Sequence, residues 1–223
     1  MFGQQVIARA RHVLQDLNGT RWADSEFTTW INDGCVFIAI NRPDSCVVNA
    51  SMVLVAGTKQ SIAALPIPGM RLLDVVRELT TGRGVKLTDR NTLDTHRPGW
   101  HAATPAPVVN YVYDNRDPTT FYVYPPADPG STLEILYQRV PVAISVEQLD
   151  THALSPADLY LPALVDYVLF RAYSKDADDT KNADLAGMYL TACANGLGIK
   201  SRADLAASPD MNSAGGTPAA GGA

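Results

Sequence analysis

The spacing of hydrophobic residues predicts helices towards both ends of the chain and strands between them. Close to the N-terminus, apolar residues recur every three to four positions, which is the period of one helix face. These residues are Val6, Ala10, Val13 or Leu14, and Leu17. Asn18-Gly19 should end this helix, because both residues tolerate left-handed backbone geometry.

A second helix is expected to begin at Asp24 or Ser25, which are both favourable N-cap residues, and to stop at Arg42-Pro43. Its apolar stripe consists of Phe27, Trp30, Ile31, Gly34, Cys35 and Ile38. A glycine inside a helix costs about 1 kcal/mol relative to alanine. Gly34 is therefore expected to permit close packing against a neighbouring helix.

Between Cys46 and about Ile144 the apolar period changes to two, which is the period of strands. Strands are expected at residues 47–56, 61–65, 108–113, 120–124 and 132–140, with turns at 57–60, 114–118 and 125–130. Residues 71–79 fit either a strand or a helix, and their surroundings favour a strand. The whole stretch predicts an antiparallel β-sandwich or small barrel.

Helical spacing returns near residue 155. One helix should begin at Pro162, because proline suits the first helical turn. Its apolar stripe contains Val165, Val168, Leu169 and Ala172. A last helix carries Leu185, Met188, Tyr189, Ala192 and Cys193 and should end at Gly196-Leu197.

These elements predict an α+β fold in which the N- and C-terminal helical pairs, residues 1–45 and 146–202, form a four-helix bundle. Residues 46–145 form the β insertion, and residues 203–223 form an extended C-terminal tail. The tail is low in complexity, since 16 of its 21 residues are Ala, Gly, Ser, Pro or Thr. The side chains expected to pack the helical frame are Trp22, Phe27, Trp30, Ile31, Val168, Leu169 and Tyr189.

Composition and charge narrow the function classes. With 46% hydrophobic and 18% charged residues, the chain can bury a core, yet no apolar run approaches the roughly 18 residues that a transmembrane helix needs. Neither a membrane partner nor export is expected. The net charge of −5 argues against tight binding to DNA phosphates. Residues 46–145 are nearly neutral, whereas the helical frame is acidic, and an acidic wall around a duplex would let it slide.

The sequence predicts no catalytic, metal or cofactor site. The densest polar patch, residues 94–101, contains Asp94, His96 and His101, which suggest a general base or a metal. We favour a surface loop that Trp100 anchors to the β core. Five tyrosines could form a stacking platform, but aromatic residues on strands more often pack in the core. They are Tyr111, Tyr113, Tyr122, Tyr124 and Tyr137.

Two segments resemble phage head-to-tail adaptor (connector) proteins. Residues 22–34 resemble their opening helix, and residues 167–179, with Leu197-Gly198 after the next helix, resemble their closing helical pair. The β insertion is similar to that of the tail tubular protein A, or gatekeeper, group of short-tailed phages.

The resemblance implies a structural virion protein without catalytic residues. It would form a dodecameric ring that joins the portal of the capsid to the tail and surrounds the DNA exit channel. The implied partners are the portal protein, neighbouring copies in the ring and a downstream tail or nozzle protein, with double-stranded DNA passing non-specifically. Such a protein is assembled in the host cytoplasm and resides at the head-tail junction. Its tail would reach the portal, with Leu205 and Met211 as candidate contacts.

Two other classes remain open. A β-rich module of a phage tail that binds carbohydrate or protein would explain the tyrosines. A small hydrolase would use His96 and His101 together with Asp94.

Overall fold

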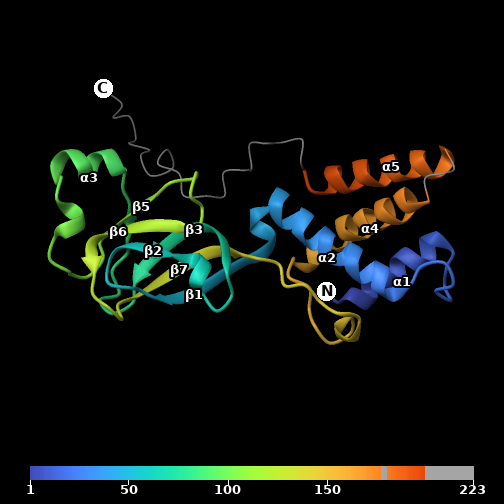
Figure 1. The fold of residues 1–223 in the computed structure, drawn as a ribbon, viewed down its shortest axis with the longest axis horizontal. Coiled ribbons are helices and arrows are strands. Elements are labelled where there is room, and N and C mark those ends of the chain that lie inside the picture. Colours follow the sequence, from blue (N-terminus) through green and yellow to red (C-terminus); the bar gives the residue numbers. More distant parts are fainter. Residues whose placement is uncertain (177–179, 199–223) are drawn as a thin grey trace, which may run out of the picture. The chain divides into compact units, whose positions relative to one another are not determined.

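The computed structural model describes residues 1–176 and 180–198 and divides them into two compact units (Figure 1). The helical unit comprises residues 1–46 and 140–198, and the β unit comprises residues 47–139. Each unit has a hydrophobic core of its own. The fold is therefore mixed α and β, and the β unit interrupts the helical one.

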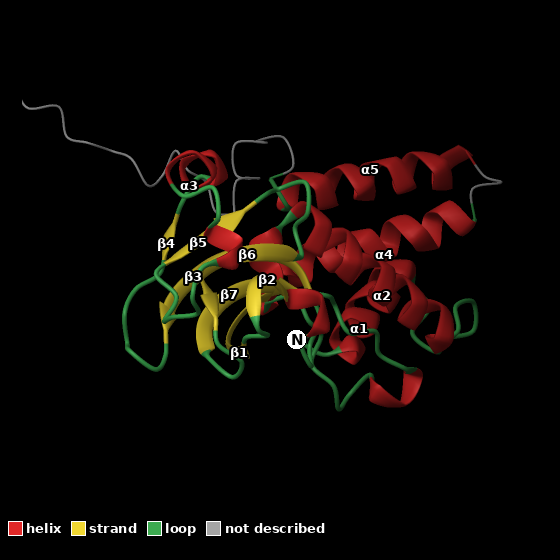
Figure 2. Cartoon of the chain, turned by 60° about the vertical axis from the view of Figure 1, so that its left-hand side comes forward, coloured by secondary structure: helices red, strands yellow, loops and turns green. Residues whose placement is uncertain are grey.

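One helix organises the helical unit. Its helices are α1 (Gly3–Leu14), α2 (Asp24–Asn41), α4 (Leu161–Lys175) and α5 (Thr180–Gly196), with short 3₁₀ turns η1 (Pro43–Cys46), η4 (Val146–Gln148) and η5 (Asp158–Tyr160). Helix α4 packs against each of the other three (Figure 2). The two helical pairs, although far apart in sequence, thus share one core. As expected, α4 begins with Pro162 in its first turn.

Helix α2 shows why the sequence needs a glycine at its centre. A Cβ atom at Gly34 would lie 2.5 Å from Leu164 Cδ1 and 2.9 Å from Tyr167 Cδ1 on α4. This confirms that Gly34 permits close packing. The helix begins at Asp24, but the cap is Ala23, whose N–H donates to the Glu26 carboxylate at 3.3 Å.

The expected end of the first helix is wrong. Helix α1 stops at Leu14, because Gln15 adopts a left-handed conformation with φ of 56°. Leu17, assigned to the apolar stripe, is 69% exposed. The chain instead folds around the carboxylate of Asp16.

The β unit contains two open sheets. In the first, β1 (Val47–Val53), β7 (Thr132–Arg139) and β3 (Gly69–Glu78) lie in the order β1-β7-β3. In the second, β2 (Gly57–Ser61), β6 (Thr120–Ala127), β5 (Asn110–Tyr113) and β4 (Lys86–Leu87) lie in the order β2-β6-β5-β4. Neither sheet closes into a barrel, and β4 runs parallel to β5, so the expectation of a wholly antiparallel insertion is wrong.

Alternate residues of both sheets meet in one core. The first sheet contributes Met52, Leu72, Val75, Leu133, Ile135 and Tyr137, and the second contributes Tyr111, Phe121, Val123 and Ala127. Alternation places the intervening side chains of β5 and β6 on the opposite face. There Val112, Tyr122 and Tyr124 contact Leu93 and Trp100.

The cover over that face includes a helix that the sequence pattern did not predict, α3 (Arg90–His96), followed by η3 (Trp100–Ala102). The Asp89 carboxylate caps α3 by accepting the N–H of Asn91 at 3.1 Å. Trp100 is 2% exposed, which confirms that it anchors this segment to the strands.

Two further expectations are corrected. Residues 57–60 lie in β2 rather than in a turn, and they pair with β6 in the second sheet. The buried Gln60 side chain bonds to both the N–H and the C=O of Val55 and so fixes the segment that leads into β2. Residues 62–64 form the 3₁₀ helix η2 (Ile62–Ala64) instead of continuing a strand. By contrast, the strand at residues 71–79 and the hairpin between β5 and β6 are confirmed.

Candidate functional site

The residues predicted to pack the helical frame lie around α4. Phe27 and Trp30 of α2 meet edge to face with ring centroids 5.5 Å apart, and Trp22 meets Trp30 in the same way at 5.7 Å. Ile31, Val168 and Leu169 are buried in the same core. Tyr189 is partly buried, and its ring stacks on that of Tyr173 of α4 at 5.6 Å.

The loop between α1 and α2 is built on Asp16, a residue that the sequence patterns did not single out. Its carboxylate accepts backbone N–H groups from Thr20 at 2.8 Å, from Arg21 at 3.2 Å and from Trp22 at 3.0 Å. Burial works to raise the pKa of Asp16, but these hydrogen bonds and the Arg11 charge outweigh it and hold the pKa below its ordinary value. The loop therefore depends on an ionised carboxylate.

Charged side chains connect this loop to the neighbouring helices. Arg11 donates to the carbonyl of Trp22 at 3.1 Å and to the carboxylate of Asp24 at 2.8 Å. Lys175 pairs with Glu26, and its ammonium group lies 5.3 Å from the centroid of the Trp22 ring. The loop, α2 and the end of α4 are thus joined by ion pairs at one edge of the helical unit.

A shallow hollow of about 440 Å³ adjoins these ion pairs. It is lined by Trp30, Phe170, Arg171, Ser174 and Lys175. Arg171 lies 3.5 Å from the carboxylate of Asp33, so its charge is already partly compensated. An aromatic floor beside two basic side chains suits a partner's side chain better than a reacting substrate.

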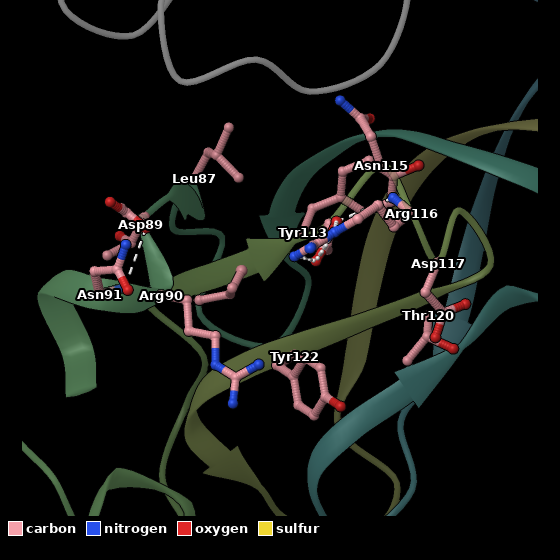
Figure 3. Close-up of a pocket in the computed structure, with 13 residues that line it drawn as sticks. Leu87, Asp89, Arg90, Asn91, Tyr113, Asn115, Arg116, Asp117, Thr120 and Tyr122 are labelled. Carbon is pink, nitrogen blue, oxygen red and sulfur yellow. Dashed lines mark hydrogen bonds and ion pairs between the residues drawn. The ribbon is translucent and has the colours of Figure 1, made fainter.

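The β unit has a separate polar pocket of about 470 Å³ on the outer face of its second sheet (Figure 3). Tyr122 lines it together with Arg90 at the start of α3 and the hairpin turn after β5. In that turn, Arg116 forms a bidentate pair with Asp114 and, with its backbone N–H, lowers the pKa of that carboxyl to about 2. These charges satisfy each other, and the pocket offers hydrogen bonds rather than an activated group.

Two of the three residues of the hydrolase alternative, Asp94 and His101, have other partners. Asp94 accepts the indole N–H of Trp100 at 2.9 Å. His101 Nδ1 lies 2.8 Å from the hydroxyl oxygen of Thr58, and the His101 ring stacks on Trp100 with centroids 3.6 Å apart. His96 is exposed at the end of α3. Within the part of the chain that the structure describes, no hydrogen bond joins Asp94 to either histidine.

The tyrosines do not form one platform. Tyr111 and Tyr137 lie in the core between the sheets, and Tyr122 and Tyr124 pack against Trp100. Tyr113 is partly buried and, with Tyr122, lines the polar pocket. All five thus take part in packing, in agreement with the preference for core positions.

In residues 1–176 and 180–198, no three His, Cys, Asp or Glu side chains gather closely enough to hold a metal ion. Among the same residues, no helix is both long and apolar enough to span a bilayer. Leu205 and Met211 lie outside the described residues.

The two packed units, each with a hydrophobic core of its own, define the class as a two-unit α+β protein. The family comparison makes this class specific. The model of the SU10 adaptor protein family matches residues 1–216, so the chain belongs to that family. The family is one of structural phage adaptors, virion components that associate with head and tail, and not of enzymes. A comparison with curated proteins found no match.

Proposed function

We propose that this protein forms a dodecameric ring that joins the portal of a phage capsid to the tail and surrounds the DNA exit channel, as expected of the tail tubular protein A group. The observation that carries the proposal is the family match over residues 1–216, which spans both units and nearly the whole chain. A match limited to one unit would instead have suggested a shared module.

The two units take different roles in this proposal. The helical unit contacts the portal and neighbouring copies, and the hollow beside Trp30 supplies an anchor point for a partner's side chain. The β unit faces the downstream tail or nozzle protein. Outside residues 46–145 the chain carries nine basic and 15 acidic residues, so an acidic surface can face the channel. Repulsion of phosphates would then let double-stranded DNA pass without specific binding.

The tail, residues 203–223, is proposed to reach the portal, with Leu205 and Met211 as its apolar contacts. Both side chains would fill small pockets, while the surrounding Ala and Gly residues suit a narrow groove. On this proposal the ring is completed in the host cytoplasm, where the adaptor meets capsids that already carry a portal.

Light scattering after size-exclusion chromatography, with and without purified portal, tests the proposal. We expect a ring either of the adaptor alone or on the portal, visible in electron micrographs as a closed annulus. Leu205→Ser/Met211→Ser should weaken portal binding, whereas the matched substitution Ala206→Ser/Asn212→Ser should not. An adaptor that stays monomeric in the presence of portal would contradict the ring.

A further inference from the structure

Strand β1 has an open edge that differs from the other sheet edges of the β unit. It lies at the end of the order β1-β7-β3 (Figure 1) and pairs with β7 through seven consecutive residues without a register shift. Its sequence, Val-Val-Asn-Ala-Ser-Met-Val, contains no charge and no proline. Natural sheets usually protect an edge with charges, bulges or very short strands.

The other edges carry such protection. Strand β3 has three register shifts and four charged residues, and residues 83–85 occupy part of its free side. Strand β4 is two residues long, and β2 combines a register shift with Lys59. Among the edges that the structure describes, β1 therefore stands out as a template for another strand.

The hydrogen-bond pattern shows which groups of β1 are open. Leu54 donates to Ser131 and accepts from Gly130, so the even-numbered residues of this strand bond to β7. Thr132 of β7, which lies opposite Val53, accepts the N–H of Leu79 just after the end of β3. Thr132 therefore bonds away from β1, as expected when hydrogen-bonded and non-hydrogen-bonded pairs alternate along an antiparallel ladder. The N–H and C=O groups of Val47, Asn49, Ser51 and Val53 consequently point away from β7. In the described chain, no hydrogen bond from another element reaches them.

The order of residues in β1 indicates which strand can pair with its open edge. In an antiparallel pair centred on Ala50, Val47 faces Val53, Val48 faces Met52, and Asn49 faces Ser51. The strand therefore matches itself in reverse, with valines meeting valines and an amide meeting a hydroxyl. The same register brings together the four residues with open backbone groups, so each facing pair can exchange two hydrogen bonds.

We propose that β1 pairs with β1 of a second copy of this chain about a two-fold axis that passes between the two Ala50 residues. The result is a continuous six-stranded sheet, β3-β7-β1 joined to β1-β7-β3. Val47 and Val53, which are 42% and 65% exposed in the single chain, become cross-strand partners. Each β1 has one open edge, so this contact joins two copies and then stops. It cannot build the ring and does not depend on the proposed function.

A disulfide reports the register directly. Ala50 would face its own copy as a non-hydrogen-bonded pair, with Cα atoms roughly 4.5 Å apart, a separation that a disulfide can bridge. Ala50→Cys should give a disulfide-linked dimer under mild oxidation. Val53→Cys is the matched control, because its copies would lie far apart even though this position is more exposed than Ala50. The native cysteines Cys35, Cys46 and Cys193 are all buried.

Equal or stronger cross-linking of Val53→Cys, or none of Ala50→Cys, would overturn the pairing and favour a strand from a different protein. Because the cross-link reports the register in a dimer or in a larger assembly, failure of the ring would not affect this result.

A second pair of variants tests the contact without a covalent bond. Ser51→Pro removes an N–H that points to the open edge and leaves the ladder to β7 intact, so sedimentation should show loss of the dimer with an unchanged circular dichroism spectrum. Asn49→Lys/Ser51→Lys places like charges opposite each other and should also abolish the dimer. Asn49→Lys/Ser51→Glu places opposite charges there and should restore it. A dimer that persists in both Ser51→Pro and the double-lysine variant would refute the proposal.

Discussion

The helical unit and the β unit are held together in different ways. The helical unit joins two stretches of chain that are far apart in sequence, and all its long helices meet at α4. The β unit is one continuous stretch whose ends are neighbours, since Val47 of β1 faces Gln138 of β7. A unit whose ends meet needs nothing from its surroundings to close, whereas the helical unit exists only when both of its halves are present.

Separating the two units should therefore have the largest and most unequal effect. Residues 47–139 expressed alone should fold and unfold cooperatively, because their core and both sheets are complete within that range. Residues 1–46 expressed alone should remain unfolded, because α1 and α2 lose α4. Circular dichroism and amide exchange would check both fragments. An unfolded β fragment would show that the two units are not independent.

The next largest effect compares two buried tryptophans. Trp30, 6% exposed, lies in the main core of the helical unit, and Trp30→Ala should destabilise that unit by about 3–5 kcal/mol. Trp100 is even more deeply buried, at 2% exposed, but belongs to a small cluster on the outer face of β5 and β6. Trp100→Ala should loosen residues 88–103 and leave both sheets folded. Hydrogen exchange resolved by residue distinguishes the two, and a Trp30→Ala protein that melts like the parent would contradict this view of the core.

Acid should affect the loop around Asp16 in a defined direction. The pKa of Asp16 in the folded protein lies below its ordinary value of 3.8, so its stabilising contribution is complete above that value. The contribution is lost as the pH falls through the folded pKa, because the unfolded chain binds the proton more readily. Asp16→Asn should remove this acid dependence and lower the Tm at neutral pH, by less than Trp30→Ala does. Melting curves from pH 2 to pH 7 would test it, with exposed Asp150→Asn as the comparison.

The smallest expected effects come from two helix glycines and have opposite signs. At Gly34 an added Cβ must displace Leu164 and Tyr167, so Gly34→Ala should destabilise the helical unit by about 1–2 kcal/mol in spite of its better helix propensity. At Gly187 of α5 an added Cβ meets no atom within 4 Å. Gly187→Ala should stabilise the protein by about 0.5–1 kcal/mol. Denaturant titrations of both variants would test the signs, and two losses of similar size would show that α5 is packed more tightly than described.

Elements with strong local patterns could be predicted from the sequence, whereas features that depend on individual contacts could not. Periodicity correctly indicated both ends of α2, the start of α4 and the strand at residues 71–79, because these elements have strong local patterns or a proline at a boundary. It missed α3, whose short sequence has a single buried apolar residue, Leu93. It also placed the end of α1 too late. The loop after α1 is held by three backbone N–H groups that donate to the Asp16 carboxylate, and such contacts leave no hydrophobic pattern in the sequence.

The candidate sites were less accessible to sequence reasoning. The partners of Lys175 and Arg171 lie far away along the chain, so the hollow beside Trp30 appears only when α2 meets α4. The open edge of β1 depends on the order of strands, and β1 looks like any other strand until β7 is known to cover just one of its sides. In contrast, the resemblance of residues 22–34 and 167–179 to phage head-to-tail adaptors agrees with the family match, whereas the narrower resemblance to the tail tubular protein A group stays a prediction.

The central position of α4 also has a consequence for synthesis on the ribosome. Helix α2 ends at Asn41, and α4 does not begin until Leu161, so at 5–20 residues per second the first two helices wait roughly 6–24 s for their partner. During this interval Phe27, Trp30 and Ile31 have no core to enter and are suitable ligands for a chaperone. The β unit emerges between them and can finish folding first. The middle of the nascent chain therefore folds before its N-terminal helices do.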